Sequence, residues 1–441
     1  MTAYAKHLPT GATPATDVST WGVEAAERWR GARAPAVFAP GAGSRVLGPL
    51  VVLSLVLILR NDAPGPPAGT AWRAYPDAVL LVALPLWYRY LPGATLVSAT
   101  LLAVESGVAL PARPAADTAG RTGLFLVCLL SLWALTGAFL RLRARRGQAR
   151  LAGAAAGPAR FPLPARLPAG HDRRGNGRLL GGAFLCLVAA GILLDGILGD
   201  LGAHGGPHPY DAVGQQRFAL PLLVLGSTLL GAGWSADLTA RRLHRAPQPV
   251  LLVGVRAAPS GHFWLYPDAD TTAGRPLIPY RPRREDTLGS VRLLARGAPG
   301  SLPRGLHDID ARAEPFEALL YGAPYDGAEV VLEYAVHGGA GISASVTAAV
   351  LLPRRRHGLD RWIPSGVSYE QTRERRRARE RERARPYAPP ERRGRTTRGT
   401  ATAGGTGAAA TGGGCGGDGG GCGGSGCGGG CGGGCGGCGC G

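Results

Sequence analysis

The sequence is almost without lysine. Lys6 is the single one, so arginine carries nearly all of the net charge of +19. A phosphate-binding loop ends in Lys-Ser or Lys-Thr, and Lys6 stands in no such motif. A Gly-x-Ser-x-Gly nucleophile elbow and a His-Glu-x-x-His metal pair are also missing. These absences argue against P-loop nucleoside triphosphatases, serine hydrolases with a nucleophile elbow and zinc proteases. We expect a protein that is not an enzyme and needs no cofactor.

Long apolar runs dominate the first half of the chain. Residues 1–45 are mixed and polar and contain no cleavable signal peptide, so the first apolar run is expected to act as a signal-anchor. A membrane-spanning helix needs roughly 20 mostly apolar residues. The sequence therefore predicts a membrane region over 46–140 and a two-span hairpin over 179–238. The expected spans are 46–59, 75–89, 91–110, 123–140, 179–199 and 218–236.

The stretch 78–110 leaves two alternatives. Its 33 residues are too many for one span, and the cluster Trp87-Tyr88-Arg89-Tyr90, followed by Pro92, suits a turn at the membrane interface. Two spans in this stretch give six in all. A single long, kinked helix gives five.

Arginine in the connecting segments predicts the orientation. Residues 141–178, read as an arginine-rich loop, hold ten arginines against one acid, whereas residues 200–217 hold two acids against one arginine. The positive-inside rule places the first segment in the cytoplasm and the second outside the cell. This makes the chain a multi-pass protein of the cell membrane with a cytoplasmic C-terminal half. The N-terminus is expected inside with six spans and outside with five.

From residue 249 to 353 short apolar runs alternate with Gly, Pro and Ser-Gly turn signals. This pattern predicts a small, mainly β domain. The residues around Gly338–Gly341 are the best hairpin candidate, because glycine tolerates the positive φ of tight turns. Residues 313–321 are expected to form one short helix. The fold class is therefore an α-helical membrane protein with a small cytoplasmic β domain and a disordered tail.

Packing is expected to end beyond residue 353. Residues 354–400 form a basic linker, in which 370–385 predict a solvated helix with Glu–Arg neighbours at helical spacing. No aromatic residues interleave with these arginines to stack bases, so we expect contact with the anionic inner leaflet, or with an unknown protein partner, rather than with nucleic acid.

The tail, residues 401–441, is rich in glycine and cysteine and predicts disorder. Thiolates bind soft metals, and Cys435-x-x-Cys438 with Cys438-x-Cys440 has chelating spacing. The spacing shrinks steadily without a repeated pair, which also fits a low-complexity expansion that binds zinc or copper only adventitiously. The candidate metal ligands are Cys427, Cys431, Cys435, Cys438 and Cys440. This Gly/Cys-rich tail resembles those of uncharacterised multi-pass membrane proteins of actinobacteria, a resemblance that implies no activity.

Two acids fall within predicted spans. Glu105 and Asp195 are functional candidates, because a charge in lipid costs a few kcal/mol or more. Together with His204, His208 and Asp211 they would line a proton or cation path. The favoured interpretation is instead that Asp195 is hydrated near the interface and that the histidines are ordinary loop residues. A non-enzymatic membrane protein is the favoured interpretation, and a transporter or metal-handling protein is the alternative.

Overall fold

The structure, a computed structural model, consists of a helical region joined to a β barrel. It describes residues 3–8, 18–60, 70–165, 167, 174–203, 210–258, 262–270, 274–282, 292–294, 308–310, 314–338, 341–353 and 381. The tail and nearly all of the expected basic helix over 370–385 lie outside the described residues. The helices are α1 (Val23–Gly31), η1 (Ala36–Phe38), α2 (Pro40–Leu59), α3 (Tyr75–Tyr90), α4 (Pro92–Ala112), α5 (Thr118–Ala155), α6 (Asn176–Gly202) and α7 (Val213–Arg245).

Among the described residues five helices, α2, α4, α5, α6 and α7, are long and apolar enough to cross a membrane, as expected for an integral membrane protein. The ambiguous stretch forms two helices, because α3 and α4 are separated at Leu91 (φ −129°, ψ 70°). A residue before proline avoids the helical region, and proline itself suits the first helical position. The predicted break into two helices is confirmed, but of the two only α4 is among the five helices long and apolar enough to cross a membrane, so the span expected over 75–89 stays a prediction. The 16-residue α3 is the shortest of the apolar helices.

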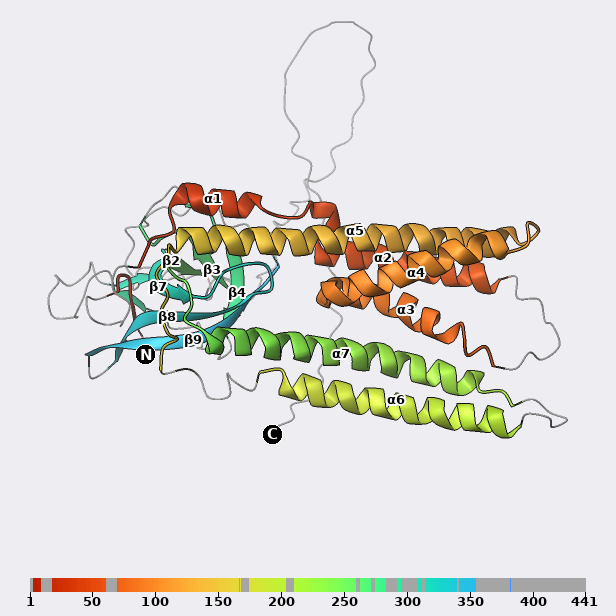
Figure 1. Cartoon of the computed structure of the whole chain (residues 1–441). Coiled ribbons are helices and arrows are strands. Elements are labelled where there is room, and N and C mark those ends of the chain that lie inside the picture. Colours follow the sequence, from red (N-terminus) through yellow and green to blue (C-terminus); the bar gives the residue numbers. More distant parts are fainter. Residues whose placement is uncertain are drawn as a thin grey trace, which may run out of the picture. The chain divides into compact units, whose positions relative to one another are not determined.

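Helix α5 is much longer than predicted. It continues to Ala155, so the first part of the segment 141–178 is helix and the expectation of a loop is wrong there. Alanine, leucine and arginine are strong helix formers, and tertiary contacts hold the extension. Gln148 and Ala152 on one face of this extension are almost fully buried. Figure 1 shows α5 and α7 reaching the barrel, with α1 beside α5.

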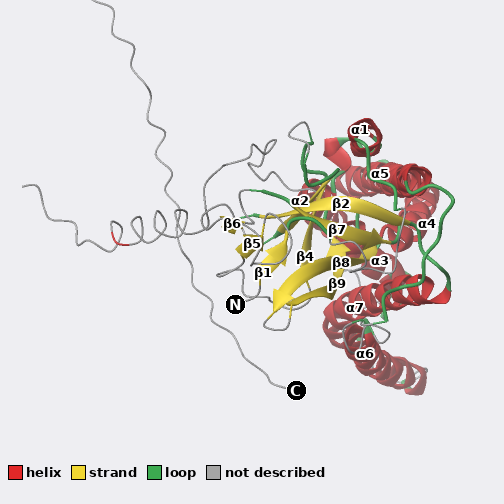
Figure 2. Cartoon of the chain, turned by 90° about the vertical axis from the view of Figure 1, so that its left-hand side faces the viewer, coloured by secondary structure: helices red, strands yellow, loops and turns green. Residues whose placement is uncertain are grey.

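In the part of the chain that the structure describes, six antiparallel strands close a barrel. Around it the strands run β2, β3, β4, β9, β8, β7 and back to β2, so two three-stranded meanders interlock. Their bounds are β2 (Val250–Ala257), β3 (Phe263–Tyr266), β4 (Ile278–Pro282), β7 (Phe316–Tyr321), β8 (Glu329–Gly338) and β9 (Gly341–Leu351). Figure 2 shows β2, β4, β7, β8 and β9 together with the helices beside them.

The barrel confirms the predicted β domain. Alternate residues fill its core, as the two-residue period of a strand requires: Leu251, Val253 and Val255 in β2, and Val330 and Leu332 in β8. The predicted hairpin is also confirmed, because β8 and β9 are paired as far as Gly338 and Gly341.

Residues 313–321 were expected to be helical, and this expectation is wrong. Phe316–Tyr321 form β7, which pairs with β2 on one side and β8 on the other. Five of its six residues are buried. Placement between two strands outweighs the helical preference of Glu-Ala-Leu-Leu, since local propensity is a weak prior.

The N-terminal segment is part of the barrel unit. Strand β1 (Ala3–Ala5) pairs with β8 and with β5 (Arg292–Leu294), which in turn pairs with β6 (Asp308–Asp310). Trp21 and Trp29 are fully buried with their rings edge to face at 5.3 Å, and Trp29 Nε1 donates to the Pro324 carbonyl at 2.8 Å. Residues 1–45 are therefore not a separate polar segment where the structure describes them.

Helices α6 and α7 approach each other closely along a row of small residues. The small residues recur every seven positions and are buried: Gly182, Ala189 and Gly196 on α6, and Ala219, Gly226, Gly233 and Ala240 on α7. A Cβ on Gly226 would lie 2.8 Å from Cys186 Sγ and 3.1 Å from the Gly182 carbonyl oxygen. Small residues allow such backbone approach between membrane helices, where no hydrophobic effect drives association.

A leucine at Gly226 should break this contact. Gly226→Leu is expected to lower the free energy of unfolding by about 1–3 kcal/mol through overpacking, and with it the thermal unfolding midpoint in detergent. Gly181→Leu is the matched control, because no atom lies within 4 Å of a Cβ added at Gly181. Equal midpoints for the two variants would contradict the close approach of α6 and α7.

Candidate functional site

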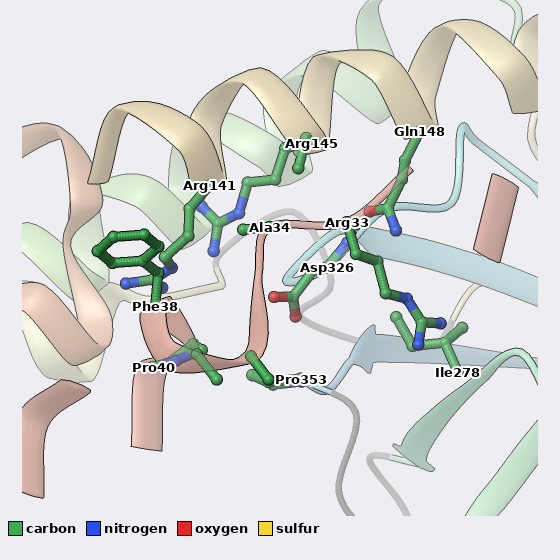
Figure 3. A pocket seen from close by; sticks show the side chains of 13 residues that line it. Arg33, Ala34, Phe38, Pro40, Arg141, Arg145, Gln148, Ile278, Asp326 and Pro353 are labelled. Atoms are coloured by element: carbon green, nitrogen blue, oxygen red, sulfur yellow. Dashed lines mark hydrogen bonds between the residues drawn. The ribbon is translucent and has the colours of Figure 1, made fainter. Parts of the chain in front are cut away.

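A pocket of about 250 Å³ lies where the helices meet the barrel. We call it the junction pocket. Residues from the α1–α2 connection, from α5, from the start of β4 and from the turn before β8 line it, and Pro353 closes it after β9. Figure 3 shows its polar side chains: Arg33, Arg141, Arg145, Gln148 and Asp326.

Arg141 and Arg145 enter the pocket from one face of α5, four residues apart. The Arg141 side chain is held by Tyr88, whose carbonyl accepts from Nη1 and whose ring centroid lies 5.1 Å from the guanidinium carbon. Arg141 is only 4% exposed, yet its Nε and Nη2 have no hydrogen-bond partner among the described residues. Arg145 forms no hydrogen bond or ion pair there either, and its Nε is buried. Two guanidinium groups thus retain free donors.

Asp326 faces these arginines from the barrel. Its backbone N–H donates to Gln148 Oε1 at 3.2 Å, which fixes the turn before β8 against α5. Its Oδ1 is buried without a partner, and no cation of the described residues lies within 4 Å of the carboxylate. Burial raises the pKa of the Asp326 carboxyl, against the opposing effect of Arg145 and Arg141.

The charges that line the pocket do not balance. Three arginines stand against one aspartate, since Arg33 also lines it while donating to the Leu277 carbonyl at 2.9 Å. A buried charge without a partner costs free energy, and an anion would offset that cost here. A guanidinium group binds phosphate or carboxylate through two parallel hydrogen bonds. The junction pocket can therefore hold an anion that also offers a hydrogen-bond donor to Asp326.

A second cluster joins the N-terminal segment to the barrel. The ligand atoms of His7, Asp270 and Glu317 lie within 4.8 Å of one another, as in a metal site. However, Lys6 Nζ lies 4.0 Å from Asp270, and the Leu8 N–H donates to Glu317 at 2.8 Å. A neighbouring ammonium opposes cation binding. These contacts instead fasten residues 6–8 to β7.

The predicted intramembrane acids do not meet. Glu105 is exposed on α4, which packs on α3 and α5, while Asp195 is exposed on α6, which packs on α7. Asp195 accepts from Gln215 Nε2 at 2.9 Å, and Asp211 accepts from the Val213 N–H at the start of α7. Other candidates lie outside the described residues: His204, His208, Cys427, Cys431, Cys435, Cys438 and Cys440. The transport and metal-handling roles of these residues stay predictions.

The junction pocket was not predicted, although the sequence holds one signal for it. Arg141 and Arg145 come directly after the expected span 123–140, at helical spacing. Their joining with Asp326 depends on how the barrel docks, which no local pattern encodes. Comparisons of the chain with models of protein families, with curated proteins and with solved structures give no match.

The His7 contacts should make stability depend on pH. The hydrogen bond from His7 to Glu317, with the charges of Glu317 and Asp270, raises the pKa of His7 above its ordinary value of 6.5. The folded state therefore binds the proton more tightly than the unfolded state. This contribution is complete below pH 6.5 and is lost as the pH rises through the folded pKa.

We expect His7→Gln to lower the unfolding midpoint at pH 6 and to leave it nearly unchanged at pH 8.5. The change in the free energy of unfolding should stay within about 1 kcal/mol, because the His7–Glu317 pair is partly exposed and solvent screens it. Glu317→Gln should abolish the pH-dependent effect of His7→Gln, which a double-mutant cycle measures. An equal effect of His7→Gln at both pH values would contradict the ion pair.

Proposed function

We propose that this chain is a non-enzymatic integral membrane protein of the cell membrane, whose barrel lies on the cytoplasmic side against the anionic inner leaflet. The observation that carries the proposal is the unequal charge at the two ends of the helices. Residues 141–178, which run from the barrel end of α5 to the start of α6, hold ten arginines and one acid. Three more arginines follow near the end of α7: Arg241, Arg242 and Arg245.

The opposite ends of the helices are nearly balanced in charge. The sequence has five arginines and five aspartates in these segments: Arg60, Arg73, Arg113, Arg121 and Arg217, with Asp62, Asp77, Asp117, Asp200 and Asp211. Cytoplasmic segments carry the arginine excess in multi-pass proteins. Anionic lipids of the inner leaflet attract such segments by about 1 kcal/mol for each basic residue near the surface. The charge asymmetry thus favours both the orientation and the lipid contact.

Contacts at the two ends of the membrane region support six crossings. The N-terminal segment pairs with β2 and β8, and the chain enters β2 directly after α7. Both ends therefore lie on the barrel side, which requires an even number of crossings. The five long helices need α3 as the sixth, although its 16 residues span only about 24 Å. Its barrel-side Trp87 and Tyr90 suit a membrane interface.

Labelling with a membrane-impermeant maleimide tests this topology. In a chain whose native cysteines are replaced by serine, single cysteines are introduced by Glu24→Cys, Ala116→Cys and Ala246→Cys, all at exposed positions. In intact cells we expect only the cysteine at 116 to react, because it lies at the far end of the helices. After permeabilisation all three should react.

The three positions separate the ways in which the proposal can fail. Labelling of 246 but not 116 in intact cells would place the barrel outside. Different behaviour of 24 and 246 would mean an odd number of crossings. Transport through Glu105 and Asp195, like a protein partner for the barrel, remains a prediction from the sequence alone.

A further inference from the structure

We propose that the junction pocket binds the headgroup of an anionic phospholipid that carries free hydroxyl groups, as phosphatidylglycerol does. Arg141 and Arg145 would bind the phosphodiester, and a headgroup hydroxyl would donate to Asp326. This inference rests on the proposed function in one respect, because it takes the barrel end of the helices to face the anionic leaflet.

The donors of the pocket fit a phosphodiester. Arg141 Nε and Nη2 and Arg145 Nε are buried without a partner among the residues that the structure describes, so the site holds N–H groups from two side chains for a ligand. Arg141 is nearly fully buried and fixed by Tyr88, so it loses little freedom when a ligand binds. Charge-assisted bonds from guanidinium to phosphate are about twice as strong as neutral ones. The pocket is therefore organised for an anion before the anion arrives.

The acceptor of the pocket selects among anions. Asp326 Oδ1 is buried without a partner in the described residues and lies on the same pocket as the arginines. A carboxylate beside the phosphate site would repel a bare anion. A ligand with a hydroxyl next to its phosphate satisfies Asp326 and the arginines together, which a headgroup without a hydroxyl cannot do.

The place of the pocket favours a lipid over a soluble phosphate ester. Arg141 directly follows the apolar run 123–140, and Pro40 of the pocket begins α2, so the site lies at the end of the apolar part of two helices. Beside it Val37 of η1 is 57% exposed, an apolar surface along which an acyl chain can lie. Basic pockets between membrane helices on the cytoplasmic side are suited to anionic headgroups. The volume of about 250 Å³ matches a headgroup rather than a large ligand.

The test is calorimetric titration of the full chain, purified in an uncharged detergent, with dioctanoyl-phosphatidylglycerol. We expect saturable binding of one lipid per chain, and no saturable binding of dioctanoyl-phosphatidylcholine. Arg145→Gln should weaken binding at least tenfold. Arg146→Gln is the matched control, because it removes the same charge from an exposed neighbour that does not line the pocket, and it should change affinity less than twofold. Arg145 has no described hydrogen bond to lose, so the lipid-free unfolding midpoint should not fall.

Two further titrations test the headgroup assignment. Dioctanoyl-phosphatidylmethanol has the same charge but no headgroup hydroxyl, and the wild-type chain should bind it at least fivefold more weakly. Asp326→Ala should remove this preference. Glycerol phosphate should bind at least tenfold more weakly than the lipid. Equal affinity for glycerol phosphate would overturn the lipid assignment in favour of a soluble phosphate ester.

Failure here can be told apart from failure of the proposed function. Equal weakening by Arg145→Gln and Arg146→Gln would overturn the pocket while leaving a diffuse attraction to the inner leaflet. Absence of saturable binding would also overturn it, without bearing on the cysteine labelling. Labelling of 246 but not 116 in intact cells would overturn the cytoplasmic placement of the barrel. The lipid titrations would still test the pocket independently.

Discussion

The position of the barrel depends on the continuity of helix α5. Its 38 residues extend about 57 Å, whereas the hydrocarbon core of a bilayer is about 30 Å thick. The excess length carries Gln148 and Ala152 to the barrel, where Gln148 binds the turn before β8 and Ala152 joins the barrel core. Helix α7 makes a second connection, because Thr239 donates to Glu329 at the start of β8 at 3.4 Å. Arg174, just before α6, pairs with the same carboxylate. The barrel is thus attached at two points to helices that enter the membrane region.

The same attachment creates the unsatisfied charges of the junction pocket. The apolar run of α5 ends at Leu140. The helical turns that follow must carry polar side chains where they leave the lipid and apolar side chains where they contact the barrel. Arg141 and Arg145 lie at this change of surroundings. Arg141 is almost fully buried against Tyr88, and Arg145 is half-buried at the pocket beside the α1–α2 connection. Docking of the barrel removes water from them, and no acid of the described residues lies within 4 Å of either guanidinium group. A ligand is the natural counter-charge, because a buried cation otherwise costs more than its few hydrogen bonds return.

Sequence reasoning found the membrane helices and the β domain because both rest on strong periodic or compositional signals. It missed β1 and α1, since Trp21 and Trp29 stand in a mixed, polar stretch whose burial depends on distant strands. It predicted a helix over residues 313–321 from local preference, whereas pairing with β2 and β8 makes Phe316–Tyr321 a strand. The close contact of α6 and α7 could have been predicted from the sequence, because small residues such as Gly182 and Gly226 recur there every seven positions. The junction pocket could not have been predicted, because Asp326 and Arg145 are 181 positions apart and come together only where the barrel packs against α5.

The claim that the N-terminal segment lies on the barrel is tested most directly by a disulfide between residues 20 and 252. Thr20 bridges Leu252 of β2, with Trp21 and Ser19 exchanging backbone hydrogen bonds with Leu252 at 3.3 and 3.1 Å. Neighbouring strand positions meet the Cα separation that a disulfide requires. In a cysteine-free background, Thr20→Cys with Leu252→Cys should cross-link almost completely in membranes after mild oxidation, as mass spectrometry of the joined peptides would show. Thr20→Cys with Ala116→Cys should not cross-link. Absence of the 20–252 disulfide under these conditions would contradict the packing of both ends of the membrane region on one side.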